Sequence, residues 1–454
     1  MATVTKRGKG YQIRVYNGYD TAGKQIVKSK TWVPPAGWSE KRALREAQHQ
    51  AALFEEQIRS GAGGNGRIRF SDFAEIWFSQ YANVHLRPKT VHRYQELMKR
   101  ITPALGHFPL EKIMPVHLLE FYQELSKSEP LNALYCCTAD LRKILWDKEL
   151  TQKDFSKISG ISENTLNSAW KKKPILRTSA EKISKYLDLP FSSLFQPASP
   201  GNTISGTTVR SYHTLIGNIL NDAVRWQYIP YNPAHRLEPP KKSSQQINYL
   251  DDIQTRRFIV LLRTAPDHWR RVILLLLLTG MRRGELLGLE WQDVDWENKT
   301  LTIQRSSLYL PERGVYTDTT KNASSRRCIH ISSEAISVLQ EQREWQIQEK
   351  LADIDWGHCN RIAVDPKGNP MHPDRLTEWF KKFIRKTDLP PITIHSLRHT
   401  YATLLIAQGV PLTAVAEQLG HADAATTATI YAHAIKTTQI AAAEKIGNLI
   451  SDLL

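Results

Sequence analysis

Residues 393–400 read Thr-Ile-His-Ser-Leu-Arg-His-Thr and follow the pair Pro390-Pro391. A threonine in this place is a favourable N-cap, so the stretch predicts a helix that begins at Thr393. His395 and Arg398 are three residues apart and project from one face of such a helix. This pairing offers a proton carrier beside a permanent positive charge, which suits the recognition of a phosphate.

Four further motifs accompany this stretch in the last third of the chain. They are T-G-M-R-R-G-E at 279–285 with Arg282, T-K-N-A-S-S-R-R at 320–327 with Lys321, L-G-H at 419–421 with His421, and T-T-A-T-I-Y-A-H at 426–433 with Tyr431. Any one of these residues is more often a surface group, or for tyrosine a core aromatic. Arg283, Arg326 and Arg327 also lie close enough in sequence to exchange roles with the candidates.

The joint order Arg–Lys–His-x-x-Arg–His–Tyr resembles the active site of the tyrosine recombinases, the phage integrase family. The resemblance implies cleavage of DNA by Tyr431 through a 3′-phosphotyrosyl intermediate. Arg282 and Arg398 would clamp the phosphate oxygens, because guanidinium groups bind phosphate through paired hydrogen bonds. Lys321 would protonate the leaving 5′-oxygen, His395 would accept the tyrosine proton, and His421 would donate to a phosphate oxygen.

The phosphotyrosyl linkage conserves the energy of the broken bond, so we expect no metal and no other cofactor. Glu285 follows Arg282 by three residues, and we expect its carboxylate to orient that arginine. The four cysteines show no zinc-site spacing, which is typical of a reducing cytoplasm.

Composition agrees with a polyanionic partner. The chain has 454 residues, 61 Lys and Arg against 45 Asp and Glu, and a formal net charge of +16. Charge alone does not separate nucleic acid from an anionic membrane surface. The longest apolar run, 272–278, is too short to span a bilayer, and the first residues lack the apolar stretch of a signal peptide. We therefore expect a bacterial cytoplasmic protein associated with the nucleoid.

Residues 1–62 predict a small basic domain. Residues 11–16 alternate apolar and polar side chains, 25–32 predict a second strand, and 39–59 predict an amphipathic helix. The region resembles the arm-binding domain of integrases, with Arg14, Lys28 and Lys30 as candidate DNA contacts; the alternative is a basic stabilising appendage. Residues 61–66 are a glycine-rich linker.

Residues 68–242 resemble the core-binding domain of the same family, in two helical halves. Lys89, near the start of a predicted helix, is a candidate DNA contact. The halves are separated by an insert at 138–200 that resembles the helix-turn-helix of Cro-type repressors, with Gly160 at the turn. Phe155, Ile158, Ile161 and Leu166 are its predicted core. Trp170 departs from this resemblance, because an acidic residue is common there.

The second helix of the motif usually enters the major groove of DNA. We expect Ser162, Asn164, Thr165 and Asn167 at base edges, and Lys171, Lys172 and Lys173 on phosphates. The alternative is that the insert is a spacer or a protein-contact module.

Residues 246–454 predict the catalytic domain. Residues 251–278 predict two helices, and 301–306 with 326–331 predict strands that flank a hairpin carrying Lys321. The tail 434–454 is amphipathic; it packs either on a neighbouring subunit or within its own chain. The expected fold class is multi-domain, mainly α with small β-sheets.

We interpret the chain as a site-specific recombinase that integrates or excises a mobile element. The resemblance implies double-stranded DNA as partner, a homotetramer on paired sites, and an excisionase or host DNA-bending proteins as accessory partners. One alternative is a recombinase that resolves chromosome dimers, and the basic N-terminal domain disfavours it. The other is a DNA-binding regulator with an inactive recombinase domain, which the complete set of six residues disfavours.

Overall fold

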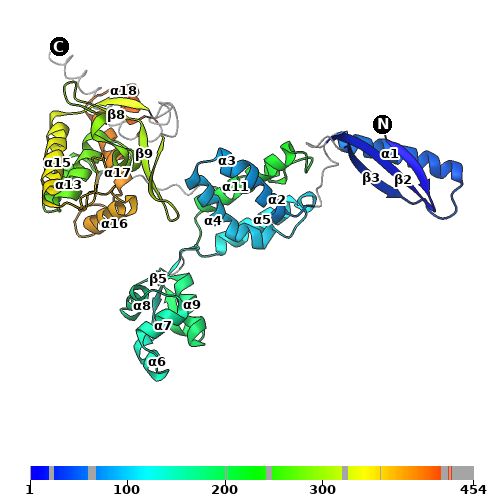
Figure 1. Ribbon diagram of the computed structural model, residues 1–454, viewed down its shortest axis with the longest axis horizontal. Helices are drawn as coiled ribbons and strands as arrows, with labels where there is room; N and C mark the ends of the chain where they lie inside the picture. The colour runs from blue at the N-terminus through cyan, green and yellow to red at the C-terminus, as the bar shows by residue number, and fades with distance from the viewer. Residues whose placement is uncertain are drawn as a thin grey trace, which may run out of the picture. The chain divides into compact units, whose positions relative to one another are not determined.

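The computed structural model describes residues 2–19, 25–59, 68–199, 201, 203–241, 248–319, 326–357, 359–420, 428 and 431. The chain forms two compact units, Met1–Ser244 and Gln245–Leu454. Within the described residues the fold is mainly helical (Figure 1), and its strands form four small sheets. The expected fold class is therefore confirmed.

The N-terminal part is an antiparallel sheet with one helix. Strands β1 (Thr3–Arg7), β2 (Gly10–Tyr19) and β3 (Gln25–Trp32) pair in the order β1-β2-β3. Helix α1 (Glu40–Arg59) contacts β1 and β2 (Figure 1). Alternate residues Tyr11, Ile13 and Val15 are buried, as their spacing predicts. Strand β1 was not anticipated from the sequence.

The register of this sheet places the candidate DNA contacts Arg14, Lys28 and Lys30 on two different faces. Lys30 pairs with Ile13 and Lys28 with Val15, so both lysines belong to the face that holds the buried residues. Arg14 pairs with Ser29 and is exposed on the opposite face. The three side chains therefore do not form one patch on one face of the sheet.

Four helices on both sides of the insert share one hydrophobic core. They are α2 (Phe70–Trp77), α4 (Pro88–Leu105), α5 (Pro115–Lys127) and α11 (Gly206–Arg225). Shorter helical segments are Phe78–Ala82, α3 (Asn83–His85), Leu110–Lys112 and Pro233–Arg236. The buried indole of Trp77 donates a 2.7 Å hydrogen bond to Asp222 and so joins α2 to α11. Ile204 N donates to Ser128 O at 3.0 Å, which brings the two ends of the interruption together.

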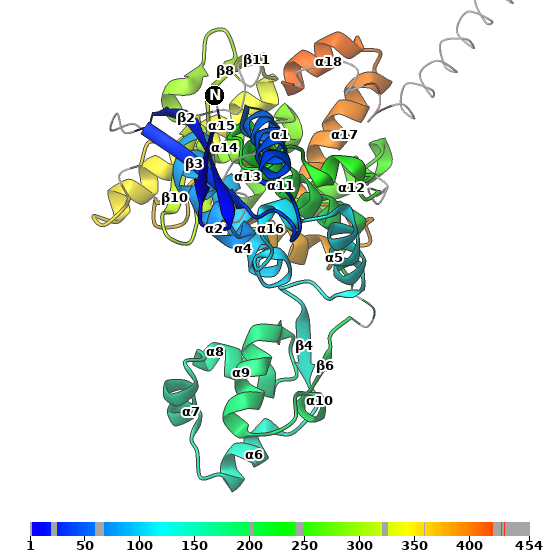
Figure 2. The ribbon, with the colours of Figure 1, turned by 90° about the vertical axis from the view of Figure 1, so that its right-hand side faces the viewer.

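The insert has a hydrophobic core of its own. Its helices are α6 (Leu141–Asp147), α7 (Gln152–Ser159), α8 (Glu163–Trp170), α9 (Arg177–Leu187) and α10 (Phe191–Leu194). Strand β4 (Leu134–Cys137) pairs with β5 (Ile175–Leu176) and with β6 (Phe195–Pro197). Figure 2 shows β4 beside β6. Gly160 ends α7 with a positive φ of 65°, in agreement with its predicted place at the turn.

Two residues of the insert, Ile158 and Trp170, depart from the expected pattern. Ile158 is 56% exposed and is not a core residue, because the buried stripe of α7 runs through Phe155 and Ser159. Trp170 packs against the insert core, and the guanidinium of Arg142 lies 5.2 Å from the centre of its ring. A cation–π contact thus holds α6 to the end of α8.

The second unit contains seven helices and two sheets among its described residues. The helices are α12 (Asp252–Leu262), α13 (Asp267–Thr279), α14 (Arg283–Gly288), α15 (Ser333–Ala352), α16 (Pro373–Ile384), α17 (Ile394–Ala407) and α18 (Leu412–Leu419). Helix α13 contacts both α15 and α17 (Figure 1). The two helices predicted over 251–278 are confirmed.

Two sheets of this unit contain the strands that precede and follow Lys321 in the sequence. Strands β7 (Val294–Asp295), β8 (Thr300–Ile303) and β11 (Arg327–His330) form one sheet in the order β11-β8-β7. Strands β9 (Arg305–Leu310) and β10 (Gly314–Thr319) form the other. The β9–β10 hairpin was not predicted; β10 precedes Lys321 in the chain and β11 follows it.

Several predictions fall on residues outside the described ranges: the linker 61–66, Lys321, His421 and the tail 434–454. Each helix in the described part of the chain is too short or too polar to cross a membrane.

Candidate active site

Helix α17 positions Arg398 at the centre of the site. Thr393 caps this helix by accepting a hydrogen bond from Ser396 N, as predicted. The side chain of Arg398 is enclosed, and the residue is only 2% exposed. Its Nη1 donates to Gly280 O at 3.0 Å, and its Nη2 donates to Leu419 O at 2.6 Å.

Arg282 approaches the same place from the start of α14. Its Nη2 donates to Gly420 O at 3.1 Å, and its Nη1 lies 2.7 Å from Glu285 Oε1. Glu285 also accepts from Arg282 N at 3.0 Å. The contact predicted between Glu285 and Arg282 is therefore present. The side chain of Arg282 is 39% exposed, so this guanidinium is open to a ligand.

A third guanidinium, that of Arg327, completes the cluster. Its Nε donates to Gln418 O at 2.9 Å, and its Nη2 lies 2.9 Å from Glu285 Oε2. Three consecutive carbonyls at the end of α18 thus accept from three arginines. The last carbonyls of a helix lack partners within it and carry partial negative charge, so they attract these cations.

Sequence reasoning did not select Arg327, although a signal was present. Period-two alternation along β11 places Arg327 on the same side as Ile329, which is 1% exposed. Arg326 is exposed. Of the two adjacent arginines, only Arg327 therefore points toward the interior.

Two glycines shape the backbone that receives the arginines. Gly280 ends α13 with a φ of 63°, and Gly420 ends α18 with a φ of 66°. Both conformations favour glycine. A Cβ on Gly280 would lie 2.3 Å from the ring of Tyr401, so that position also lacks space for a side chain.

The site is strongly positive, with one buried carboxylate. Burial, and then the charge of Arg282, lower the pKa of Arg398 to about 9, so the group stays charged at neutral pH. Burial opposes ionisation of Glu285, but the hydrogen bond and charge of Arg327, and then Arg282, outweigh it. The pKa of Glu285 is therefore below its usual value.

Tyr431 lies inside the domain. It is 1% exposed and packs with Ala402, Ile406, Val415 and Leu419. Burial raises the pKa of its hydroxyl to about 12, although Arg398 acts in the opposite direction. The hydroxyl is 2.9 Å from Nδ1 of His399, a residue that sequence reasoning did not select.

His395 is exposed on α17, and its ring centre lies 4.7 Å from that of His399. Crowding by neighbouring protein atoms lowers the pKa of His395, and Arg398 and Arg282 lower it further. The ring is therefore neutral at pH 7 and able to accept a proton. In this structure the partner of the Tyr431 hydroxyl is His399 and not His395.

A partly buried ion cluster supports β9 and β10, the strands before Lys321 in the sequence. Arg305 Nη1 lies 2.9 Å from Glu290 Oε2 and 2.7 Å from Asp293 Oδ2. Arg361 donates to Thr317, on the neighbouring strand β10. These contacts fix the β9–β10 hairpin against the segment after α14.

The candidate DNA contacts outside the catalytic unit differ in whether their side chains already make hydrogen bonds within the protein. Lys89, Asn164, Asn167, Lys171, Lys172 and Lys173 are exposed. Ser162 caps α8 by accepting from Thr165 N at 3.2 Å, and the two hydroxyls lie 2.9 Å apart. Ser162 and Thr165 therefore already have a structural role at the start of α8.

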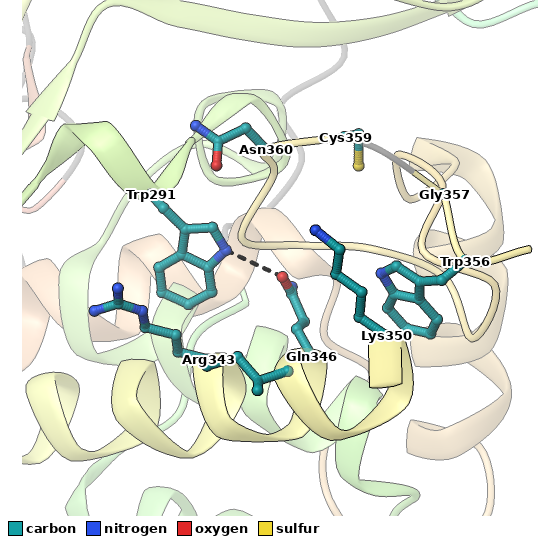
Figure 3. A pocket seen from close by; sticks show the side chains of 9 residues that line it. Trp291, Arg343, Gln346, Lys350, Trp356, Gly357, Cys359 and Asn360 are labelled. Atoms are coloured by element: carbon teal, nitrogen blue, oxygen red, sulfur yellow. Dashed lines mark hydrogen bonds between the residues drawn. The ribbon is translucent and has the colours of Figure 1, made fainter. Parts of the chain in front are cut away.

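A separate cavity of about 370 Å³ lies beside α15 (Figure 3). Arg343 and Lys350 line it together with Trp291, whose indole donates to Gln346 at 3.0 Å. None of the six catalytic candidates is among its described lining residues. The arginine cluster is thus distinct from this cavity.

Comparison with known families matches three parts of the chain. Residues 248–438 match the phage integrase family, 69–126 match the phage integrase N-terminal SAM-like domain, and 140–197 match the Cro/C1-type HTH DNA-binding domain.

Relatives include a tyrosine recombinase XerC-like protein of Caldanaerobacter subterraneus, 31% identical over 266 residues, which are 54% of this chain and 67% of the relative. The ICEBs1 integrase of Bacillus subtilis is 26% identical over 248 residues, again 54% and 67% of the two chains. A structure of the Tn1549 transposon integrase with transposon right end DNA has the same fold. It has a TM-score of 0.56 at 18% identity and covers 83% of this chain and 98% of that one.

The family match and the relatives therefore define a DNA-cleaving enzyme of the tyrosine recombinase class. The chain belongs to the phage integrase family and is a site-specific recombinase, which cleaves and rejoins DNA.

Proposed function

We propose that the chain integrates or excises a mobile element by cleaving DNA at the arginine cluster. The observation that carries this proposal is the convergence of Arg282 and Arg398 on the end of α18, immediately before His421. A phosphodiester carries a full negative charge shared by its two non-bridging oxygens, so these oxygens compete well with the carbonyls of Leu419 and Gly420 for the guanidiniums. The scissile phosphate would bind beside these carbonyls, where the guanidinium of Arg282 is exposed.

In the proposed reaction the hydroxyl oxygen of Tyr431 attacks phosphorus, the P–O5′ bond breaks, and a 3′-phosphotyrosyl bond forms. The tyrosine proton passes to His395, and Lys321 protonates the departing 5′-oxygen. His421 donates to a non-bridging oxygen. Attack by a 5′-hydroxyl of the partner strand reverses these steps, so religation uses the stored bond.

Tyr431 is not placed for attack in the structure described here. A nucleophile must contact phosphorus, whereas this hydroxyl is buried and hydrogen-bonded to His399. We infer that DNA binding draws Tyr431 out of this contact. Departure from the buried site also removes the burial that raises its pKa.

The other parts of the chain would bind DNA on either side of the cleavage site. We assign an arm-binding role to residues 1–62, a core-binding role to 68–242 and DNA contact to the insert at 138–200, through Asn164 and the lysines after α8. The enzyme would act as a homotetramer on nucleoid DNA in the bacterial cytoplasm, with accessory DNA-bending or excisionase proteins. A chromosome-dimer resolvase would need no arm-binding domain.

The test begins with sequencing the junctions of the element that encodes the chain, which supplies the site. A nicked duplex of that sequence, from which the cleaved fragment diffuses away, should trap a covalent complex with the full-length protein. Trapping should continue in EDTA without nucleotide, and DNA binding should weaken steeply with salt. Binding without any trapped complex would favour a DNA-binding regulator. Insertion only at a chromosomal resolution site would favour the dimer resolvase.

A further inference from the structure

The guanidinium of Arg327 joins three elements of the site. Arg327 is the first residue of β11 and pairs with Ile303 of β8. Its Nη2 reaches Glu285 on α14, and its Nε reaches the carbonyl of Gln418 on α18. With 6% of its side chain exposed, it is among the more enclosed charged groups of the unit. It therefore lies behind the surface that DNA would contact.

Arg327 also lies against the residue that precedes His421. A Cβ on Gly420 would be 2.9 Å from Nη1 and 3.1 Å from Cζ of Arg327. The backbone of Gly420 thus packs directly on the guanidinium, while its carbonyl accepts from Arg282. The side chain of Gln418 adds a second link, because its amide donates to His330 O at the end of β11.

The balance of charge around Glu285 gives Arg327 a role in the site. Glu285 Oε1 contacts Arg282, and Oε2 contacts Arg327. If Arg327 were absent, the charge of Glu285 would be balanced by Arg282 alone. Arg282 would then offer less net positive charge to a phosphate. With Arg327 present, its guanidinium balances the carboxylate of Glu285, and the more exposed guanidinium of Arg282 remains available to the phosphate.

We propose that Arg327 is a positioning residue for DNA cleavage. It neutralises Glu285 so that Arg282 serves the phosphate, and it holds the end of α18 that leads to His421. This inference rests on the proposed role of Arg282 as a phosphate ligand. Arg327 itself does not touch the substrate in this scheme.

The test uses the full-length protein and compares Arg327→Ala with Arg326→Ala. Each variant loses one positive charge at adjacent positions, but the side chain of Arg326 is exposed. Single-turnover formation of the covalent complex should slow about 10²-fold for Arg327→Ala, the effect of a displaced catalytic group. It should stay near the wild-type rate for Arg326→Ala. A near wild-type rate for Arg327→Ala would overturn the proposal.

A neutral methylphosphonate at the scissile position separates positioning from direct contact. Arg282→Ala should recover part of its rate on this substrate, because less charge needs to be neutralised. Arg327→Ala should recover less, because it keeps Arg282 beside the phosphate, and the lost support of the end of α18 does not depend on the charge of the substrate. Recovery equal to that of Arg282→Ala would overturn the positioning role. The ratio of rates on the two substrates is internal to each variant, so partial unfolding does not change it.

Arg327→Lys provides a second variant that keeps the charge. A lysine cannot hold Glu285 and the Gln418 carbonyl with the geometry of the fork, so its rate should fall between those of wild type and Arg327→Ala. A rate below that of Arg327→Ala would contradict the charge argument. Failure of the proposed function has a different signature: wild-type protein would form no covalent complex, or Tyr431→Phe would form as much as wild type.

Discussion

The hydroxyl of Tyr431 and Nδ1 of His399 are 2.9 Å apart, in a hydrogen bond enclosed by side chains of α17 and α18. The two residues are 32 positions apart in the chain. The bond satisfies a polar group in an apolar setting and fixes Tyr431 in a protonated form. It defines the state of Tyr431 in the protein without DNA.

A double-mutant cycle measures this contact. His399→Ala, Tyr431→Phe and the double variant should each be less stable to urea than wild type. The coupling free energy should be about 0.5–3 kcal/mol, as for residues in direct hydrogen-bonded contact. Urea unfolding of the four proteins provides the measurement. Additive effects of the two substitutions would show that the hydrogen bond does not stabilise the protein.

Tyr431→Phe should abolish covalent attachment to DNA and leave DNA binding near the wild-type level. The substitution removes only the nucleophilic oxygen and keeps the ring that packs with Ile406 and Leu419. Gel-shift and covalent-trapping assays on one nicked substrate measure both properties. A persistent covalent complex would show that another residue is the nucleophile.

Arg282→Ala and Arg398→Ala should both slow cleavage by about 10²–10³-fold, because each removes stabilisation of developing charge. They should differ in stability. Arg398 is enclosed and bonds to Gly280 O and Leu419 O, and a hydrogen bond to a charged group contributes about 1.5–3 kcal/mol. Arg282 is partly exposed. Thermal unfolding should therefore show a clear loss for Arg398→Ala only, and equal losses would contradict this ordering.

Glu285 should contribute to stability in a pH-dependent manner. Its folded-state pKa is lowered, so its contribution is complete above its unfolded pKa of about 4.3 and declines as pH falls through the folded value. The stability advantage of wild type over Glu285→Gln should hold between about pH 6 and pH 8 and shrink below about pH 4. Urea unfolding across this range tests the sign. An advantage that grew on acidification would show that the pKa is raised instead.

Replacing residues 130–202 with a short Gly-Ser linker should leave the core-binding helices folded. The ends are already adjacent, since Ile204 N donates to Ser128 O at 3.0 Å, and the insert has a separate hydrophobic core. Circular dichroism reports whether the remaining helices form. If the insert contacts DNA, the variant should also show a shorter footprint and a smaller salt slope than wild type. An identical footprint and slope would leave the insert as a spacer or protein-contact module.

A matched control for this deletion keeps the insert and changes only its basic end. Lys171→Ala and Lys172→Ala remove exposed charges after α8 without altering the insert core. If the footprint shortens in both the deletion and the Lys171→Ala/Lys172→Ala double variant, the DNA contact lies at the end of α8. Loss in the deletion alone would assign it elsewhere in the insert.

Local sequence patterns determined much of this protein. The motif order from Arg282 to Tyr431 is read directly along the chain. The N-cap at Thr393, the two helices over 251–278 and the turn at Gly160 are properties of short segments. Neighbouring residues set helix caps, periodicity and turn conformation, so these features are readable without the fold.

The tertiary structure alone decided which groups meet. Arg282 reaches Gly420, 138 residues away, and Arg327 reaches Gln418, 91 residues away. The burial of Tyr431 and its bond to His399 also depend on how α17 and α18 pack. The contact of Arg327 with Glu285, the sharing of that carboxylate by two arginines and the contact of Tyr431 with His399 were therefore not readable from the sequence, because each joins segments that no local pattern connects.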